Sequence, residues 1–178
     1  MSVEMSTNNS KMRLMKGDIT NTEIEAFVFY ARPDLQLGSG FGGAITVRGG
    51  ASIQEELKQY GEVKVGDAVI TSAGKMKAKY IIHAVGPRFQ EKDTESKLRT
   101  TTLNVLKLAD QRGIRTLAMP AMGVGFYGVP LDISAQVTLS MVKEYLRSKT
   151  GLEEVVFCVL DNREYNSFYA QLAKLGQK

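Results

Sequence analysis

Two glycine-rich segments have the residue types and spacing to hold a phosphate-bearing ligand. One spans residues 123–128 (GVGFYG) and the other spans residues 38–43 (GSGFGG). Glycine allows positive φ and lets a phosphate approach backbone N–H groups within hydrogen-bond distance. Each segment stands between an apolar run and a helical pattern, so a helix N-terminus would add its positive end. A single G-x-G-x-x-G match is weak evidence, but two such loops predict a diphosphate held between them.

The elements that must position these loops alternate between strand and helix. Strands are predicted at residues 11–16, 26–30, 68–71, 80–85, 117–120 and 155–160. Helical segments are predicted at residues 21–25, 44–60, 93–112, 132–149 and 162–175. The second of these helical segments must break or kink at Gly49-Gly50, and Ser52 with Glu55 has the spacing of a capping box for its second half. Strands separated by helices indicate an α/β layer architecture with a largely parallel sheet and a ligand site at the carboxyl ends of its strands.

Length and composition favour a single domain. The chain has 178 residues, a net charge of +4 and a pI near 9.1, which suits anionic ligands but falls short of a dedicated nucleic-acid stripe. We expect a flexible polar tail at residues 1–10 and one domain over residues 11–178. No apolar run is long enough for a membrane span and no signal peptide is evident, so a cytoplasmic location is expected.

The chain has one cysteine and one histidine, and both are predicted to be structural. Cys158 lies in an apolar run, which favours a buried and inert thiol that suits a reducing cytoplasm. His83 lies inside a predicted strand. We expect neither a metal ion nor a cofactor.

Four sequence blocks, taken together, resemble the macro domain family. They are Gly17-Asp18-Ile19-Thr20 after the first strand, the GSGFGGAI loop, the YIIHAVGP segment that begins at Tyr80, and the PAMGVGFYGVP segment that begins at Pro120. They stand in the family's order and cover about residues 11–175. The resemblance implies a three-layer α/β/α fold with a mixed, largely parallel central sheet and a cleft that takes ADP-ribose, free or attached to a protein.

The same resemblance implies roles for individual residues. Asp18 matches the carboxylate that accepts a hydrogen bond from the adenine amine, and the Ile19 backbone faces the same ring. The two diphosphate loops would consist of Gly38, Ser39, Gly40 and Phe41, and of Gly123, Val124, Gly125, Phe126 and Tyr127. Phe126 and Tyr127 either line the distal ribose or belong to the core. Leu160 and Asn162 match the region flanking adenine, where Leu160 would offer an aliphatic surface in place of an aromatic ring.

Two residues of the predicted site, Asp18 and Arg32, also have a structural interpretation that involves no ligand. Asp18 has the position of a turn residue or helix N-cap before the 21–25 segment. Arg32 would lie near the distal ribose, where a guanidinium could grip a phosphate or carboxylate. It is otherwise a solvated side chain, or one paired with Asp34, and that pairing would remove any role in ligand binding.

The departures from the family pattern concern catalysis. Relatives that hydrolyse ADP-ribosyl bonds commonly carry Asn-Ala-Ala-Asn where this chain has Phe29-Tyr30-Ala31-Arg32, and Gly42 replaces an acidic residue that often follows the first loop. Water activation needs a base or a positioned polar group, and the usual suppliers are absent. Restoring Arg32→Asn together with Gly42→Asp is expected to recover some turnover unless Phe29 interferes.

Three functions from different classes follow. The first is a binding module for ADP-ribose or a related nucleotide diphosphate without catalysis. The second is an enzyme acting on ADP-ribose derivatives, as an ADP-ribosyl hydrolase or ADP-ribose 1″-phosphate phosphatase, through Asp34, Tyr127 or a water held by backbone groups. The third is a nucleic-acid binder that uses the basic side chains Lys75, Lys77, Lys79 and Arg88. The sequence fits a dinucleotide-binding Rossmann domain less well, because that fold requires its glycine loop directly after the first strand.

Overall fold

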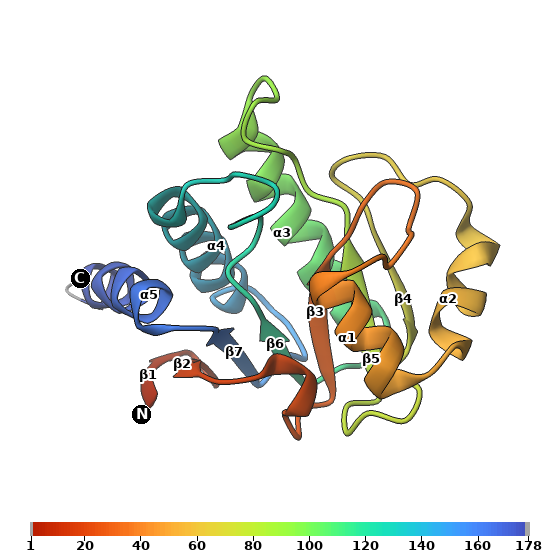
Figure 1. Cartoon of the computed structure of the whole chain (residues 1–178). Helices are drawn as coiled ribbons and strands as arrows, with labels where there is room; N and C mark the ends of the chain where they lie inside the picture. The colour runs from red at the N-terminus through yellow and green to blue at the C-terminus, as the bar shows by residue number, and fades with distance from the viewer. Residues whose placement is uncertain (1, 177–178) are drawn as a thin grey trace.

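A seven-stranded mixed sheet forms the centre of the computed structural model, which describes residues 2–176 (Figure 1). The strands are β1 (Ser2–Thr7), β2 (Ser10–Lys16), β3 (Ala26–Tyr30), β4 (Ala68–Ser72), β5 (Tyr80–Ala84), β6 (Thr116–Met119) and β7 (Glu154–Val159). Their order across the sheet is β1-β2-β7-β6-β3-β5-β4. The five inner strands are parallel, while β1 and β4 pair antiparallel at the two edges. The five parallel strands therefore end at the same edge of the sheet, and the two glycine loops follow two of them, β3 and β6.

Helices cover both faces of this sheet, so the predicted three-layer α/β/α fold is confirmed (Figure 1). The helices are α1 (Gly40–Gly49), α2 (Ser52–Leu57), α3 (Thr94–Gln111), α4 (Leu131–Leu146) and α5 (Asn162–Leu175), with short 3₁₀ turns at Ile19–Asn21 and Lys58–Tyr60. Helices α3, α4 and α5 share one buried cluster with the sheet. Helices α1 and α2 share the other cluster.

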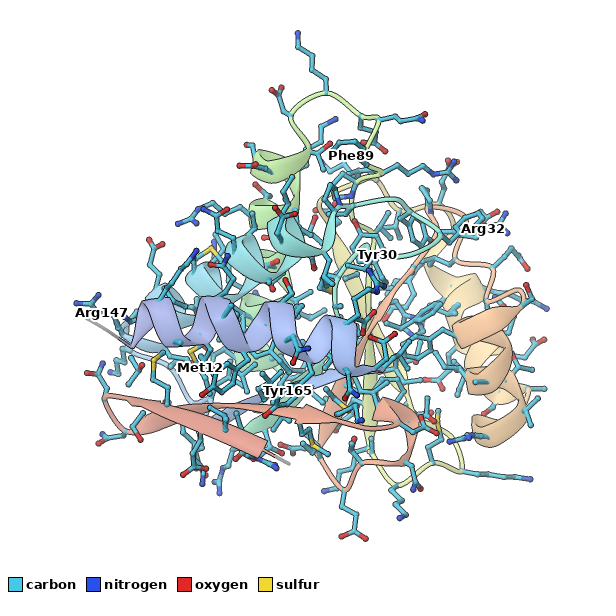
Figure 2. All side chains as sticks on the ribbon, turned by 60° about the vertical axis from the view of Figure 1, so that its left-hand side comes forward. Met12, Tyr30, Arg32, Phe89, Arg147 and Tyr165 are labelled. Carbon is cyan, nitrogen blue, oxygen red and sulfur yellow. The ribbon has the colours of Figure 1, made fainter. Side chains whose placement is uncertain are left out.

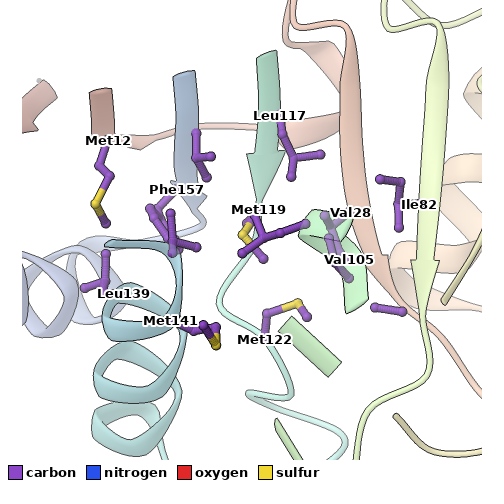
Figure 3. Close-up of a cluster of buried hydrophobic side chains, with 14 of the residues drawn as sticks. Met12, Val28, Ile82, Val105, Leu117, Met119, Met122, Leu139, Met141 and Phe157 are labelled. Atoms are coloured by element: carbon purple, nitrogen blue, oxygen red, sulfur yellow. The ribbon is translucent and has the colours of Figure 1, made fainter. Parts of the chain in front are cut away.

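The apolar alternation along each strand explains the two clusters. Successive side chains of a strand point to opposite faces, so in β3 Val28 belongs to the α3–α5 side and Phe27 to the α1–α2 side. Figure 3 shows the first cluster, in which side chains from β2, β7, β6, β3 and β5 form a row between the sheet and helices α4 and α3. Because both faces of the sheet are buried, the inner strands have nearly continuous apolar sequences.

The N-terminal residues correct one expectation. Ser2–Thr7 forms β1 and pairs with β2 along its whole length, so the prediction of a flexible tail is wrong for residues 2–10. A tight turn at Asn8, where φ is 55°, joins the two strands, and asparagine tolerates this left-handed conformation. Val3 and Met5 pack against the core. Met1 lies outside the described residues, as do residues 177–178 of the expected domain.

Two further details of the helices differ from prediction. Helix α1 begins at Gly40 instead of residue 44, so the GSGFGG segment is itself a helix N-terminus. The chain does break at Gly50, where φ is 98°, but Ala51 rather than Ser52 caps α2 and no side chain caps it. The predicted capping box is therefore wrong, because Ser52 is already the first residue of the helix.

Candidate functional site

A cleft of about 400 Å³ lies at the carboxyl edge of the parallel strands. Its walls come from the segments that follow β2, β3, β6 and β7 in the sequence. The predicted site residues in its lining are Ile19, Arg32, Gly38, Ser39, Gly40, Phe41, Gly123, Val124, Phe126, Tyr127 and Leu160. Asp18, Gly125 and Asn162 are outside this lining. The volume is within the range of small-molecule sites.

The first wall is the N-terminus of α1. Gly38 and Gly40 have φ values of 64° and 61°, a left-handed conformation that glycine adopts without strain. Ser39 caps the helix through its backbone only, because its side chain makes no capping hydrogen bond. The first N–H groups of a helix have no partner within the helix. Those of α1 therefore remain available to a ligand in the cleft, together with the positive end of the helix dipole.

Gly42 lies where the preceding loop crosses α1. A Cβ atom at this position would be 1.7 Å from the Leu37 carbonyl oxygen. Gln54 of α2 holds the loop there, since its side chain accepts from the Leu37 N–H and donates to the Leu35 carbonyl. The backbone geometry therefore excludes an acidic side chain at residue 42, so Gly42→Asp cannot restore one in this loop conformation.

The second glycine loop forms another part of the lining. At Gly123 φ is 77°, and a Cβ atom would lie 2.6 Å from Val129, so glycine is required both for the turn and for the packing. The described residues supply no acceptor for the N–H groups of Gly125, Phe126 and Tyr127. Phe126 is 85% exposed at the rim of the cleft. Two sets of free backbone amides thus border one cleft.

Tyr30 and Tyr127 line the cleft side by side. Their rings meet edge to face with centroids 4.8 Å apart. The Tyr30 hydroxyl donates to the Pro87 carbonyl, and its ring fills the space beside Gly86, where a Cβ atom would lie 2.3 Å from it. Burial raises the pKa of both tyrosines, and the Arg88 and Arg32 charges counteract the shift at Tyr127. Both hydroxyls are therefore protonated at neutral pH.

Phe29 contributes an aromatic floor beside these tyrosines. Its ring contacts the Phe41 ring at 5.1 Å and the His83 ring at 5.9 Å. Phe29 and Phe41 both line the cleft. The floor at this point has no hydrogen-bonding side-chain atoms to orient a water molecule.

Arg32 lies on the exposed loop above this floor (Figure 2). Its guanidinium donates to Asp34 at 2.6 Å, and both side chains are about half exposed. The other Asp34 oxygen accepts from the Gln36 N–H. Arg32 lines the cleft, but its charge is already paired with Asp34, as the alternative interpretation without a ligand predicted.

Asp18 has the position predicted for a helix cap. Its Oδ1 accepts from the backbone N–H of Thr20 at 3.0 Å and from the Thr20 hydroxyl at 2.6 Å. Its Oδ2 forms an ion pair with Arg48 of α1. Burial alone would raise the pKa of Asp18, but the hydrogen bonds from Thr20 and Arg48 outweigh it and hold the pKa below its ordinary value. Both oxygens are thus engaged.

The strand ends of β2 and β7 form the remaining wall. Leu160 is 73% exposed and lines the cleft with Ile19. The Asn162 side chain is outside the lining and accepts from Lys16 at 2.8 Å. Cys158 is buried, as predicted, and also lines the cleft. Burial and the nearby Asp18 charge raise the pKa of its thiol to about 11, so it is protonated at neutral pH.

Glu164 is a lining residue that sequence reasoning missed. It is 6% exposed, and its Oε1 accepts from the Leu160 N–H at 2.8 Å. Asp161 caps α5 by accepting from the Glu164 N–H. The spacing of Asp161 and Glu164 is that of a capping box, and this signal could have placed the Glu164 carboxylate beside the end of β7.

The basic residues that were candidates for nucleic-acid binding lie at two separate ends of the molecule. Lys77 and Lys79 lie before β5 and line a shallow depression with Glu23, Glu25 and Glu153. Arg88 follows β5, next to Tyr127. Across residues 2–176, no helix is long and apolar enough to cross a membrane, and the same residues contain no cluster of metal-binding side chains.

Comparisons with known proteins agree with this architecture. The family model for the macro domain matches residues 31–138. An uncharacterized protein of Saccharolobus solfataricus is 42% identical, over 87% of this chain and 88% of its own length. Among solved structures, the Oceanobacillus iheyensis macrodomain with ADP has a TM-score of 0.93 at 24% identity, covering 98% of this chain and 96% of that chain.

A Trypanosoma brucei macrodomain in complex with ADP-ribose has a TM-score of 0.85 at 25% identity, covering 90% of this chain and 68% of that chain. The family model matches more than half of the chain, and the two macrodomain structures share its fold over at least 90% of its length. This chain belongs to the macro domain family.

Proposed function

We propose that this protein binds ADP-ribose, or a related nucleotide diphosphate, in the cleft without hydrolysing it. The observation that carries the proposal is the pair of free backbone amide sets, one at the α1 N-terminus and one at Phe126 and Tyr127, in segments that line the same cleft. Backbone N–H groups and a helix N-terminus are a general solution for binding phosphate. Related macrodomains have been solved with ADP and with ADP-ribose.

The two ends of the cleft suit the two ends of such a ligand. The aliphatic Ile19 and Leu160 side chains offer a surface for a base over β2 and β7. The Tyr127 and Phe126 rings offer a surface for the distal ribose. Because Phe126 is exposed at the rim, the proposal includes ADP-ribose attached to a protein as well as the free nucleotide.

The polar groups near the distal end support binding without turnover. A general base needs an unpaired acceptor within reach of the attacking water. Asp34, one of the candidates, is occupied by Arg32 and by the Gln36 N–H. Tyr127 holds its proton, because burial raises its pKa. Gly42 has no room for a side chain.

Calorimetry on the purified protein tests binding. We expect a heat of binding with ADP-ribose, and an affinity that falls shallowly with salt because only about two phosphate charges are neutralised. NAD and ATP serve as comparison ligands. The proposal fails if ADP-ribose gives no binding, or if homopolymer RNA binds more tightly with a steep salt dependence.

A single-turnover assay tests the absence of catalysis. Protein in excess over an ADP-ribosylated protein substrate should release no ADP-ribose, and ADP-ribose 1″-phosphate should keep its phosphate. Arg32→Ala is the informative variant, since it also frees Asp34. Clearance by the wild type but not by Arg32→Ala would mean that Arg32 belongs to a catalytic site and that the binding-module proposal is wrong.

A further inference from the structure

We propose that a surface beside the cleft, formed by Arg88, Phe89 and Phe126, binds the polypeptide to which the ADP-ribose is attached. The polypeptide segment that suits this surface has an apolar and an acidic side chain next to its modified residue. We call these three residues the rim surface. The inference rests on the proposed function, because it concerns the protein-bound form of the same nucleotide.

The sheet order separates the rim surface from the part of the cleft that suits the base. Arg88 and Phe89 follow β5, whereas Ile19 follows β2 and Leu160 follows β7. Strands β6 and β3, which lead into the glycine loops, lie between β7 and β5. With about 4.8 Å between neighbouring strands, β2 and β5 are roughly 19 Å apart. A nucleotide diphosphate whose base lies over β2 and β7 would therefore direct its second ribose toward β5 and the rim surface.

Hydrogen bonds attach the rim surface to two tyrosines that line the cleft. The Tyr30 hydroxyl donates to the Pro87 carbonyl, and the Phe89 N–H donates to the Tyr127 carbonyl at 3.1 Å. Figure 2 shows Phe89 at the same end of the molecule as Tyr30. Arg88 and Phe89 are nevertheless outside the lining of the cleft. They would therefore meet only the part of a ligand that extends out of the cleft.

Two phenylalanine rings of the rim surface are exposed. Phe126 is 85% exposed and Phe89 is 48% exposed. The Phe126 ring meets the Tyr127 ring edge to face at 5.4 Å, and the Phe89 Cβ lies 3.6 Å from the place that a Cβ atom would have at Gly128. Both phenylalanines thus border the same loop. Exposed aromatic rings that gather at one place are typical of interaction sites.

Arg88 gives the rim surface a positive charge without a partner. Its side chain is exposed and forms no ion pair or hydrogen bond among residues 2–176. Its charge is close enough to Tyr127 to oppose the rise in the pKa of that side chain. Arg32, in contrast, is already paired with Asp34. A free guanidinium beside apolar rings suits a carboxylate on the partner.

The mixed charge around the rim surface favours a polypeptide over a nucleotide polymer. The Asp34 charge reaches Tyr127, and Glu91 lies in the same segment as Arg88, whose N–H it accepts from. A nucleotide polymer carries phosphate charge on every unit and needs a continuous basic groove. Apolar rings with one free cation and nearby carboxylates instead fit a polypeptide segment that is only locally acidic.

The segment that carries Arg88 and Phe89 is already ordered without a partner. The Thr94 hydroxyl lies within hydrogen-bond distance of the carbonyls of both residues and of Glu91. Glu91 also forms an ion pair with Lys97 at 3.4 Å. Because these contacts restrain the segment beforehand, little of its entropy remains to be lost when a polypeptide binds.

The test compares free ADP-ribose with short peptides that carry ADP-ribose on a serine hydroxyl. In one peptide a leucine and a glutamate flank the modified serine, and in the second peptide a lysine replaces the glutamate. Calorimetry gives the ratio of the conjugate's affinity to that of free ADP-ribose. We expect the glutamate peptide to bind about five- to thirtyfold more tightly than free ADP-ribose, the gain from covering a phenylalanine ring. The lysine peptide should gain less.

Two variants of the rim surface and one matched control complete the test. Phe89→Ser should remove most of the advantage of the glutamate peptide, and Arg88→Glu should reverse the preference between the two peptides. Tyr169→Ser is the control, because Tyr169 is also 48% exposed but lies on α5, and it should leave both ratios unchanged. Free ADP-ribose should bind all three variants within about twofold of the wild type, because none of these residues lines the cleft. If Phe89→Ser does not fold, the charge reversal at the exposed Arg88 still decides.

The outcomes separate this inference from the function on which it rests. If the wild type binds free ADP-ribose and both conjugates equally, the rim surface does not bind a polypeptide and the binding function stands. Tighter binding of an ADP-ribose polymer than of the glutamate peptide, lost in Phe89→Ser, would assign the rim surface to nucleotides and overturn the inference. If the wild type binds neither free ADP-ribose nor a conjugate, the proposed function and this inference both fail.

Discussion

His83 is a buried histidine whose protonation state can be deduced from its surroundings. The Thr71 hydroxyl donates to the Ser72 carbonyl, so it is left to accept from His83 Nε2 at 2.9 Å. The ring therefore carries its proton on Nε2. Nδ1 is a bare acceptor with no partner in the described chain. Burial lowers the pKa of His83 to about 3.

This low pKa makes the stability depend on pH between about pH 6.5 and about pH 3. An unfolded histidine has a pKa near 6.5, so below that pH the unfolded chain binds a proton that the folded protein excludes. Stability is therefore full above about pH 6.5 and falls with decreasing pH, approaching a slope of about 1.4 kcal/mol per pH unit well below pH 6.5. Urea unfolding at several pH values between 7 and 5 measures this slope.

His83→Phe is the matched control for this experiment. Phenylalanine keeps the aromatic contact with Phe29, and the Thr71 hydroxyl keeps its bond to Ser72. Because the chain has a single histidine, the variant should have a nearly flat stability profile from pH 6.5 to pH 5. An equal slope in the variant and the wild type would contradict the assignment to His83.

Helix α1 contacts the loop that precedes it closely at Gly42, in the first wall of the cleft. The crossing loop is held against it by Gln54, so the Leu37 carbonyl has little freedom to retreat. The helix start depends on this contact, because the same loop carries Gly38 and Ser39.

Gly42→Ala should consequently disrupt the first glycine loop. With the added Cβ 1.7 Å from a backbone oxygen, we expect destabilisation of more than about 3 kcal/mol, beyond an ordinary overpacked site. Any folded fraction should lose affinity for ADP-ribose. Thermal unfolding and calorimetry measure the two effects.

Gly43→Ala is the control within the same helix. Its Cβ would meet only the Gly38 oxygen, at 3.4 Å. Alanine is also a better helix former than glycine by about 1 kcal/mol, so this variant should be as stable as the wild type or more stable. Equal stability losses in the two variants would mean that glycine is needed in α1 for flexibility and not for the close approach.

Elements that depend on local sequence patterns were predicted correctly, and elements that depend on tertiary packing were not. The strand at β3 and the helix α5 have their predicted bounds, because a buried apolar run and a helix with an Asp cap are local patterns. Strand β1 was missed because its composition is polar, although the alternation of Val3 and Met5 and the paired asparagines were visible signals. The start of α1 was missed because glycine disfavours helix, and tertiary packing overrides that preference.

Local sequence patterns could not predict contacts between side chains of different elements. The family resemblance assigned Asp18 to the candidate site, but only the fold reveals that Arg48, thirty residues away, pairs with it. The clash at Gly42 likewise depends on a loop held by Gln54 from another helix. In both cases the deciding partner lies on a separate element.

At the scale of the whole molecule, the parallel centre of the sheet is enclosed by two antiparallel edge strands. Strand β1 covers the edge of β2, and β4 covers the edge of β5. An uncovered edge presents unpaired N–H and C=O groups that promote association with other chains. No residue of β1 lines the cleft, so its contribution should be separable from binding.

Deletion of residues 1–9 tests this separation. Loss of the β1 pairing and of the Val3 and Met5 packing should cost about 2–4 kcal/mol, lowering Tm by roughly 5–15 °C for a chain of this length. Affinity for ADP-ribose should stay within about twofold, well under the tenfold that 1.4 kcal/mol represents. Light scattering should detect self-association through the exposed β2 edge. A folded monomeric deletion variant that no longer binds would contradict the independence of edge and cleft.

The close contact between Gly42 and the Leu37 carbonyl also constrains how this chain could evolve. Any side chain at residue 42 first requires the loop before α1 to move, and that loop is tied to α2 through Gln54. A mutational path toward an acidic residue there must therefore pass through a prior change at a distant position, which is a case of epistasis imposed by backbone geometry. Selection acting on residue 42 alone meets a barrier, so new chemistry in this cleft is more accessible through the side chains of residues 32 and 164.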